Sequence, residues 1–146
     1  MQIIVSGELQ ALESIFQIYG RHQVFSRPVI TLKVFEDNIL VCEFLEEKGN
    51  DRILGVDGGG SKRCAIFGGN PVVQAHNNGW AGIVVNGCVR DVDEINGCDI
   101  GVRALALHPM KANKKWIGEK HVPISIASTN NLRRRVALCS HTHMEF

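Results

Sequence analysis

The sequence predicts an α/β fold, and three features of its central part carry that prediction. Residues 53–56 and 83–85 form continuous apolar runs without polar alternation, which is typical of strands covered on both faces. Residues 71–78 lie between these runs and have the signals of a short helix. A strand, a helix and a second strand in this order are typical of a βαβ unit. In parallel sheets built from such units, reactive side chains gather where the strands end.

The first third of the chain predicts a helix, a strand and a second helix. Weak helical spacing of apolar residues within residues 1–20 predicts a short helix that ends at Gly20. Residues 24–35 are rich in β-branched side chains, which favours a strand. Asn38 can then cap a helix that Gly49 ends. The apolar side chains of this helix recur at i and i+4, at Leu40, Val41, Phe44 and Leu45.

The helix at residues 71–78 has the clearest end signals in the sequence. Asn is a good N-cap, Pro fits the first helical position, and Gly79 fits the left-handed stop. Free backbone N–H groups at such a start attract an anion. The candidate anion-binding loop therefore consists of Gly68, Gly69, Asn70 and Pro71. Strands are expected at residues 52–56, 81–85, 100–107 and 122–127, and a loop at residues 109–120.

The composition fits a single domain over residues 1–146. With 146 residues and 45% hydrophobic side chains, the chain can bury one core and is too short to expect two. The formal net charge of +1 offers no broad attraction for nucleic acid or an anionic membrane, so we expect neither partner. No apolar stretch approaches the roughly 20 residues that span a bilayer, and the first residues lack the pattern of a signal peptide. We therefore expect a soluble, cytoplasmic protein.

The cysteines and histidines give weak signals. The five cysteines include no C-x-x-C pair, which argues against a disulfide framework or a structural zinc site. We interpret most of them as small buried hydrophobic residues, and a catalytic thiol is the less favoured alternative. Four histidines are interpreted as structural or exposed, since only the last two have metal-ligand spacing: His108, His121, His141 and His143.

Asp57 and the glycines after it follow one predicted strand end. The simpler interpretation is a turn in which the Asp57 carboxylate accepts a hydrogen bond from its own backbone. A phosphate-binding loop is the alternative, but neither G-x-G-x-x-G nor a complete Walker motif is present. This strand end and the one that precedes Arg90 are expected to face one cleft.

Arg90 and Asp91 follow the other strand end, and two interpretations stay open for them. Asp91 can be the N-cap of a short turn at residues 92–95, with Arg90 in solvent. Alternatively, Asp91 holds a hard divalent cation while the Arg90 guanidinium binds a carboxylate or enolate oxygen. Asp93 and Glu94 then either support this site from outside or face solvent.

Three ordered segments resemble one protein family. They are FEDN at residues 35–38, VDGGGSKRCAIFGGN at residues 56–70 and GWAGIVVNGCVRDVDEINGCDIG at residues 79–101. On these motifs the chain resembles the family of the regulator of ribonuclease activity A and 4-hydroxy-4-methyl-2-oxoglutarate aldolase, and most closely its plant-type members. The resemblance covers about residues 15–127.

The resemblance implies a three-layer β/β/α domain of the swivelling type, assembled as a homotrimer with sites near the subunit boundaries. It implies that Arg90 contacts the substrate and that Asp91 holds Mg²⁺ or Mn²⁺. The loop of Gly68, Gly69, Asn70 and Pro71 resembles the family's substrate-binding loop. The implied activity is class II aldol cleavage of 4-hydroxy-4-methyl-2-oxoglutarate and 4-carboxy-4-hydroxy-2-oxoadipate to pyruvate and a 2-oxo acid. Decarboxylation of oxaloacetate is the implied side activity.

The rival function is a non-catalytic regulator that binds and inhibits a ribonuclease, as some bacterial relatives are named. Those relatives lack the aspartate, so the presence of Asp91 favours the aldolase. Both ends of the chain depart from the family pattern, because the opening is shorter and residues 130–146 do not resemble the usual closing strand. A missing strand would leave its neighbour unpaired, although Val136, Ala137 and Leu138 can partly take its place. We expect a less stable, less soluble and less active chain, as from a variant gene product.

Overall fold

The centre of the molecule is a set of four parallel strands. The computed structural model describes residues 2–5, 8–11, 17–20, 25–112, 114–115, 118–122, 124–126, 129–132 and 135–139. The parallel strands lie in the order β4 (Phe25–Val34), β5 (Ile53–Asp57), β7 (Gly82–Val85) and β9 (Gly101–Ala104). Four of the predicted strands are therefore present, and each connection from one parallel strand to the next contains a helix.

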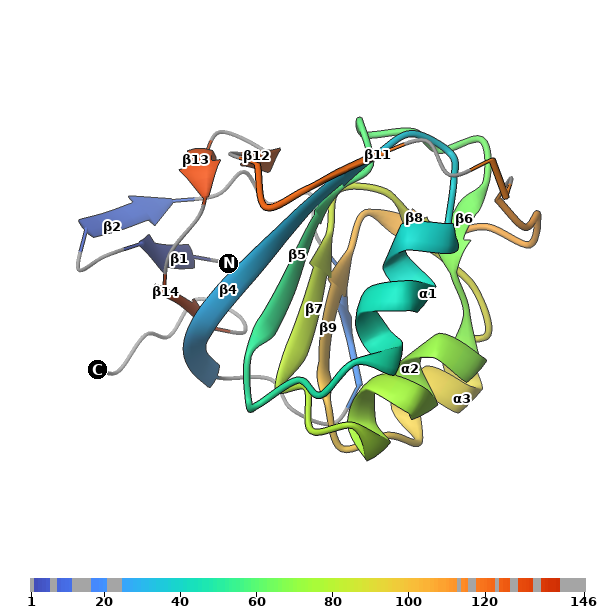
Figure 1. Ribbon diagram of the computed structural model, residues 1–146, viewed down its shortest axis with the longest axis horizontal. Helices are drawn as coiled ribbons and strands as arrows, with labels where there is room; N and C mark the ends of the chain where they lie inside the picture. The colour runs from blue at the N-terminus through green and yellow to red at the C-terminus, as the bar shows by residue number, and fades with distance from the viewer. Residues whose placement is uncertain are drawn as a thin grey trace.

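Three helices cover one face of these strands (Figure 1), namely α1 (Ile39–Glu46), α2 (Gly69–Asn77) and α3 (Val92–Asn96). Alternate strand residues such as Leu54 and Val56 point to this face and lie in one buried apolar cluster with helix residues. Leu40, Val41, Phe44 and Leu45 of α1 all belong to the cluster, as the i, i+4 spacing predicted. Burial of these side chains is the main source of stability of the domain.

A small antiparallel pair covers the opposite face. It consists of β12 (Ile124–Ile126) and β13 (Thr129–Leu132). Ile124 is buried, and a Cβ atom on Gly55 would lie 3.3 Å from its Cδ1 atom. Figure 1 shows this pair and the helices on opposite sides of the central strands. The expected three-layer β/β/α arrangement is confirmed.

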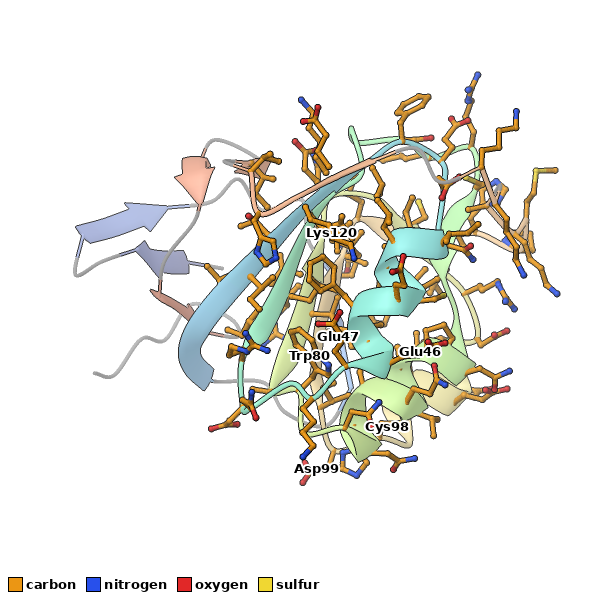
Figure 2. All side chains as sticks on the ribbon, viewed as in Figure 1. Glu46, Glu47, Trp80, Cys98, Asp99 and Lys120 are labelled. Carbon is orange, nitrogen blue, oxygen red and sulfur yellow. The ribbon has the colours of Figure 1, made fainter. Side chains whose placement is uncertain are left out.

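Hydrogen bonds tie the C-terminal ends of α1 and α2 together (Figure 2). Trp80, just before β7, donates its indole N–H to the backbone oxygen of Glu47 at 3.0 Å. The Asn78 amide donates to Leu45 O at 2.9 Å. α1 ends at Glu46, before Gly49, so Gly49 is not the left-handed stop of this helix. Gly49 lies instead against Trp80, since an added Cβ atom would be 2.5 Å from the Trp80 backbone nitrogen. The glycine is needed there for this close approach, whereas Gly79, with φ +83°, has the predicted left-handed conformation.

The helix expected within residues 1–20 is not present in the parts described there, residues 2–5, 8–11 and 17–20, so that prediction is wrong for these residues. These residues instead contain three strands, β1 (Gln2–Val5), β2 (Glu8–Ala11) and β3 (Gln17–Tyr19). β1 and β2 form an antiparallel pair, and β3 runs antiparallel to β9. Sheet pairing thus overrides a weak helical periodicity, which is a common outcome for short apolar segments. Gly20 still ends a segment, with φ +76°, but the segment is β3.

The edge next to β4 contains two strands that differ from expectation. β11 (Gly118–Lys120) pairs with the second half of β4, within residues that were expected to form only a loop. β14 (Arg135–Cys139) pairs with the first half of β4 on one side and with β1 on the other. Val136, Ala137 and Leu138 therefore pair with both strands, and β4 has a partner along this stretch.

A second sheet of three short parallel strands lies apart from the main sheet. Its strands are β6 (Ala65–Phe67), β8 (Cys88–Val89) and β10 (Ala106–Leu107), in the order β10-β8-β6. The strand expected at residues 100–107 is divided into β9 and β10, because the chain leaves the main sheet at Leu105. This sheet matters for function, since the segments that follow β6, β8 and β10 all leave from the same edge.

Within the described part of the chain, no helix is long and apolar enough to cross a membrane.

Candidate functional site

An open pocket lies where β8 and β10 end. Its volume is about 370 Å³, and the described residues that line it are Arg90, Asp91, Val92, Leu107, His108 and Pro109. The parallel register places Leu107 opposite Val89, so the residues that follow each strand lie side by side. The backbone N–H of His108 donates to Val89 O at 2.9 Å and fixes this alignment. Two segments that lie 18 residues apart in the sequence thereby form the two walls of one pocket.

Asp91 stands at the start of α3 but does not act as its capping side chain. Its side chain makes no cap hydrogen bond with that helix. Instead, its Oδ2 atom accepts the backbone N–H of Gly69 at 3.1 Å and the Nη1–H of Arg90 at 2.8 Å. Its backbone is in the left-handed region, at φ 59° and ψ 50°, which costs a non-glycine residue about 1 kcal/mol. The sequence therefore predicted correctly that Asp91 occupies the N-cap position, but the predicted capping by its side chain is wrong.

Arg90 is anchored at both its backbone and its side chain. Its backbone N–H donates to Phe67 O at 3.1 Å, and its guanidinium forms the ion pair with Asp91. The side chain is only 26% exposed, so the interpretation of a purely solvated arginine is wrong. Asp91 holds the Nη1 atom of the guanidinium, and the group lines the pocket. Its remaining N–H groups can therefore bind a planar carboxylate.

Gly68 and Gly69 lie directly against the Arg90–Asp91 pair. A Cβ atom on Gly68 would lie 2.5 Å from Asp91 Oδ2 and 2.9 Å from Arg90 Cζ. A Cβ atom on Gly69 would lie 2.6 Å from the Cβ atom of Glu94. Both contacts are closer than real Cβ atoms allow, so only glycine lets the start of α2 approach α3 this closely.

The start of α2 differs from the prediction by two residues. Asn70 is inside the helix and Pro71 follows it, while Gly68 takes the N-cap position in an extended conformation. The physical reason is that the Asp91 carboxylate, from another segment, satisfies the first amide of the helix and balances its positive end. The Gly69 N–H is bound to Asp91, and Pro71 has no N–H. Among residues 69–71, the backbone N–H of Asn70 therefore remains as the donor for a ligand. The structure brings Gly68 and Gly69 next to Arg90 and Asp91, while Asn70 and Pro71 continue into α2, and none of the four lines the pocket itself.

The Asp57 loop does not share this pocket. Asp57 Oδ1 accepts the Gly59 N–H at 2.9 Å, as the turn interpretation predicted. The loop is fixed further by Glu36, whose carboxylate accepts hydrogen bonds from Arg63 at 2.6 Å and from Ser61 at 2.9 Å. These hydrogen bonds, first that of Arg63, hold the pKa of the Glu36 carboxyl below its usual value. The expected common cleft is therefore absent among the described residues that line the pocket.

Asp91 is the carboxylate that lines the pocket, and the residues around it fit a weakly held hard cation. No group of three or more His, Cys, Asp or Glu side chains among the described residues could enclose a metal ion. Mg²⁺ does not need such a cage, because it keeps several waters and is commonly bound through one or two carboxylates and the substrate. Both recorded contacts of the Asp91 carboxylate in the described part of the chain fall on Oδ2. Oδ1 is the oxygen of this carboxylate that would bind a hard cation such as Mg²⁺ or Mn²⁺.

Asp93 and Glu94 lie in the first turn of α3 and are exposed. Glu94 approaches the start of α2, since a Cβ atom on Gly69 would touch its side chain. Neither carboxylate is among the described residues that line the pocket. Glu94 therefore lies against the start of α2, and its support of the site stays a prediction.

His108 is the pocket residue that sequence reasoning missed. It was interpreted as structural or exposed, and it lines the same pocket as Arg90. Its distance from Arg90 in the sequence hid this shared location, and only recognition of β8 and β10 as neighbouring parallel strands could have indicated it. His121 is exposed and its ring meets Phe44 edge-on at 5.4 Å, as expected of a structural residue. His141 and His143 lie outside the described residues.

Cys88 in β8 and Cys64, which directly precedes β6, do not contribute to the pocket lining. Cys64 and Cys88 are buried, and burial raises the pKa of both thiols. A raised pKa leaves little thiolate at neutral pH, so neither is suited to be a nucleophile. The interpretation as small buried hydrophobic residues holds for these two.

Comparison with known proteins agrees with the motifs. The matching family model is RraA-like, described as Aldolase/RraA, and it covers residues 4–135. A protein of Arabidopsis thaliana with the provisional name 4-hydroxy-4-methyl-2-oxoglutarate aldolase 2 is 73% identical over 128 residues, which make up 88% of this chain and 77% of that protein. A protein of Cupriavidus taiwanensis with the same provisional aldolase name is 50% identical over 123 residues, or 84% of this chain and 74% of that protein.

A solved structure supports the same assignment. The RNA-processing inhibitor RraA from Thermus thermophilis is 40% identical and superposes with a TM-score of 0.81, covering 92% of this chain and 87% of that one. The family match therefore extends over the central strands, the three helices and the Arg90–Asp91 pair alike. The chain belongs to the RraA-like family, in which the aldolase and the RraA proteins stand together.

Proposed function

We propose that this protein is a divalent-metal-dependent aldolase that cleaves 4-hydroxy-2-oxo diacids to pyruvate and a second 2-oxo acid. The substrates proposed are 4-hydroxy-4-methyl-2-oxoglutarate and 4-carboxy-4-hydroxy-2-oxoadipate. The observation that carries the proposal is the placement of Asp91. It lines the pocket beside Arg90, and its Oδ2 atom is held by Arg90 and by the first amide of α2. The aldolase names of the plant and bacterial relatives support it.

Asp91 is the residue proposed to hold Mg²⁺ or Mn²⁺. When bound, the cation would act as a Lewis acid for the 2-oxo acid end of the substrate. Two neutral or cationic donors on Oδ2 keep the carboxylate oriented without occupying Oδ1. A carboxylate held in this way needs no side-chain reorganisation when the ligand arrives, which is the benefit of a preorganised site.

Arg90 is proposed to stabilise the negative charge that forms during cleavage. The 4-hydroxyl group loses its proton, the C3–C4 bond breaks, a carbonyl forms at C4, and the electron pair remains as the enolate of pyruvate. A proton on C3 then completes pyruvate. The Arg90 guanidinium donates charge-assisted hydrogen bonds to the 2-oxo acid head, an effect worth about 3 kcal/mol if it resembles other preorganised oxyanion donors.

The loop of Gly68, Gly69, Asn70 and Pro71 is proposed to set the position of this pair and to face the substrate. Its close approach to Arg90 and Asp91 supports the first role, and the Asn70 amide at the start of α2 supports the second. The same enolate would form on loss of carbon dioxide from oxaloacetate, where the C3–C4 bond breaks and its electrons stay on C3. Decarboxylation of oxaloacetate is therefore proposed as a side activity.

The assembly is proposed to be a homotrimer with sites near the subunit boundaries. Two large apolar side chains at the pocket side of β10 support this, since Leu107 is 46% exposed and Met110 is 62% exposed. Apolar side chains of this kind beside an open pocket are suited to cover by another subunit. Sedimentation should then give three times the chain mass of 16.1 kDa, and a monomer would contradict the proposal.

A coupled assay tests the proposed activity directly. The purified protein should release pyruvate from 4-hydroxy-4-methyl-2-oxoglutarate with Mg²⁺, and an excess of a chelator should stop the release. The alternative function, inhibition of a ribonuclease, is favoured by the similarity to the Thermus RraA structure. It predicts the opposite pair of results, with no pyruvate release in either condition and a dose-dependent loss of cleavage by an RNA-degrading endonuclease when the protein is added.

A further inference from the structure

His108 is fixed on a rigid part of the pocket wall. The residue follows β10, its N–H is bound to Val89 O, and the turn after it is attached to β6, because the Ala65 N–H donates to Met110 O at 2.7 Å. The imidazole Nδ1 atom accepts the backbone N–H of Met110 at 3.1 Å. Both the position and the rotation of the ring are thereby determined by backbone groups.

The hydrogen bond to Met110 also determines where the imidazole proton lies. A nitrogen that accepts an N–H cannot carry a proton of its own, so the neutral ring has its hydrogen on Nε2. Nε2 then carries a hydrogen, so it is a hydrogen-bond donor and has no free lone pair with which to accept. In this state His108 can donate a hydrogen bond to a ligand but cannot take a proton from one through Nε2.

The pocket has two walls of different chemistry. Arg90 and Asp91 on the β8 side are suited to the 2-oxo acid head of a substrate, as proposed above. On the β10 side, His108 stands between apolar Leu107 and Pro109, so its Nε2–H is the side-chain hydrogen-bond donor of that wall among the described lining residues. A diacid held by its head at Arg90 would place its far carboxylate toward this second wall.

We propose that His108 is a specificity-determining residue that donates Nε2–H to the distal carboxylate of the diacid. This inference rests on the proposed function for the orientation of the substrate. A site built around such a donor discriminates against an analogue that lacks the acceptor, because the donor is then left without its partner. The pocket therefore selects 2-oxo diacids over 2-oxo monoacids of the same length.

The test uses two unreactive ligands of equal chain length. 2-Oxoglutarate has a distal carboxylate but no 4-hydroxyl group, so it cannot undergo aldol cleavage. In 2-oxopentanoate a methyl group replaces the distal carboxylate. Calorimetric titration in the presence of Mg²⁺ should show that the wild-type protein binds 2-oxoglutarate at least about tenfold more tightly, as a hydrogen bond to a charged group would give. The exposed His76, at the end of α2, provides a control, and His76→Ala should keep this preference.

Two variants separate the donor role from a role in the turn. In His108→Gln the side-chain amide can place an N–H near the position of Nε2, and we expect most of the preference to remain. In His108→Asn the side-chain oxygen can still accept the Met110 N–H, but no donor reaches the ligand, so the preference should fall to about twofold or less. If His108 only stabilises the turn, the result is reversed, with Asn retaining the preference and Gln losing it.

Kinetics on 4-hydroxy-4-methyl-2-oxoglutarate gives a second reading. A donor to the distal carboxylate that binds ground state and transition state alike should raise KM about tenfold in His108→Asn with little change in kcat. A large loss of kcat at unchanged KM would overturn the assignment, and so would an unchanged ligand preference in His108→Asn or the absence of 2-oxoglutarate binding by the wild type. Absence of pyruvate release together with a His108-dependent preference would instead refute the aldolase proposal and leave this inference standing.

Discussion

Asp91 combines properties that a simple capping residue does not need. Its backbone is in the left-handed region, its carboxylate accepts hydrogen bonds from Gly69 and Arg90, and it lines the pocket. A strained backbone conformation persists only where the surrounding structure over-determines it, and such residues gather at functional sites. The sequence could predict that Arg90 and Asp91 act together, because their side chains are adjacent. It could not predict that Gly69 holds the carboxylate, because that contact depends on how α2 packs against α3.

Replacement of Arg90 by lysine tests whether the guanidinium shape matters at this position. Arg90→Lys keeps the charge but loses the fork that can pair with Asp91 and a substrate carboxylate together. We expect kcat for pyruvate release to fall about 100-fold, as for loss of one preorganised donor, with little change in melting temperature. A variant with nearly wild-type turnover would show that Arg90 acts only as a diffuse positive charge.

At the scale of elements, the second sheet is what the sequence did not reveal. β8 and β10 have two residues each, too few for periodicity to indicate a strand. Their pairing nevertheless brings His108 to Arg90 and creates the pocket. The parallel strands β4, β5, β7 and β9 and the helices α1 and α2 were predictable, because their apolar patterns and end signals are local. Asn38 takes the predicted N-cap position of α1, but its side chain makes no cap hydrogen bond, and the Asp37 carboxylate accepts the Ile39 N–H at 3.1 Å.

A methyl group at Gly68 tests the close packing of α2 against the site. The added Cβ atom in Gly68→Ala would lie 2.5 Å from Asp91 Oδ2, so Arg90 and Asp91 must move, although the extended backbone of residue 68 accepts alanine. A displacement of about 1 Å can cost 100-fold in rate. We expect a loss of that order in pyruvate release with only a small change in stability.

Gly97→Ala is a matched control for this change. Gly97 follows α3 in a right-handed conformation, and its added Cβ would lie 3.3 Å from the nearest atom, Glu94 O. This variant should retain most of the activity. Equal activity of the two variants would mean that the approach of α2 does not control the geometry of Arg90 and Asp91.

At the scale of the whole molecule, the C-terminal segment is the point on which sequence reasoning and structure differ most. An unpaired neighbour of a missing strand was expected, whereas β14 pairs with β4 and β1. The expected lower stability relative to relatives with the usual ending stays a prediction. The register could not be derived from the sequence, because Val136–Leu138 gives too short an apolar run and Arg135 beside it resists burial.

Hydrogen exchange can test this pairing. If β14 is an integral strand, backbone amides of residues 135–138 and of residues 25–27 in β4 should exchange slowly and together, because the two strands share hydrogen bonds. Fast exchange of residues 135–139 beside slow exchange in β5 and β7 would contradict the pairing. It would also support the original expectation of a destabilised edge.

The central claim is that Asp91 carries metal-dependent aldol cleavage, and the magnesium dependence of pyruvate release by Asp91→Asn tests it most directly. Asparagine tolerates the left-handed backbone and can still accept the Gly69 N–H, so the fold should be retained while the anionic metal ligand is lost. The exposed Asp99 provides a control of equal chemistry away from the pocket, as Asp99→Asn. We predict pyruvate release that rises with Mg²⁺ for the wild type and for Asp99→Asn, and none above background for Asp91→Asn at any Mg²⁺ concentration. A wild-type response to Mg²⁺ in Asp91→Asn would contradict the account.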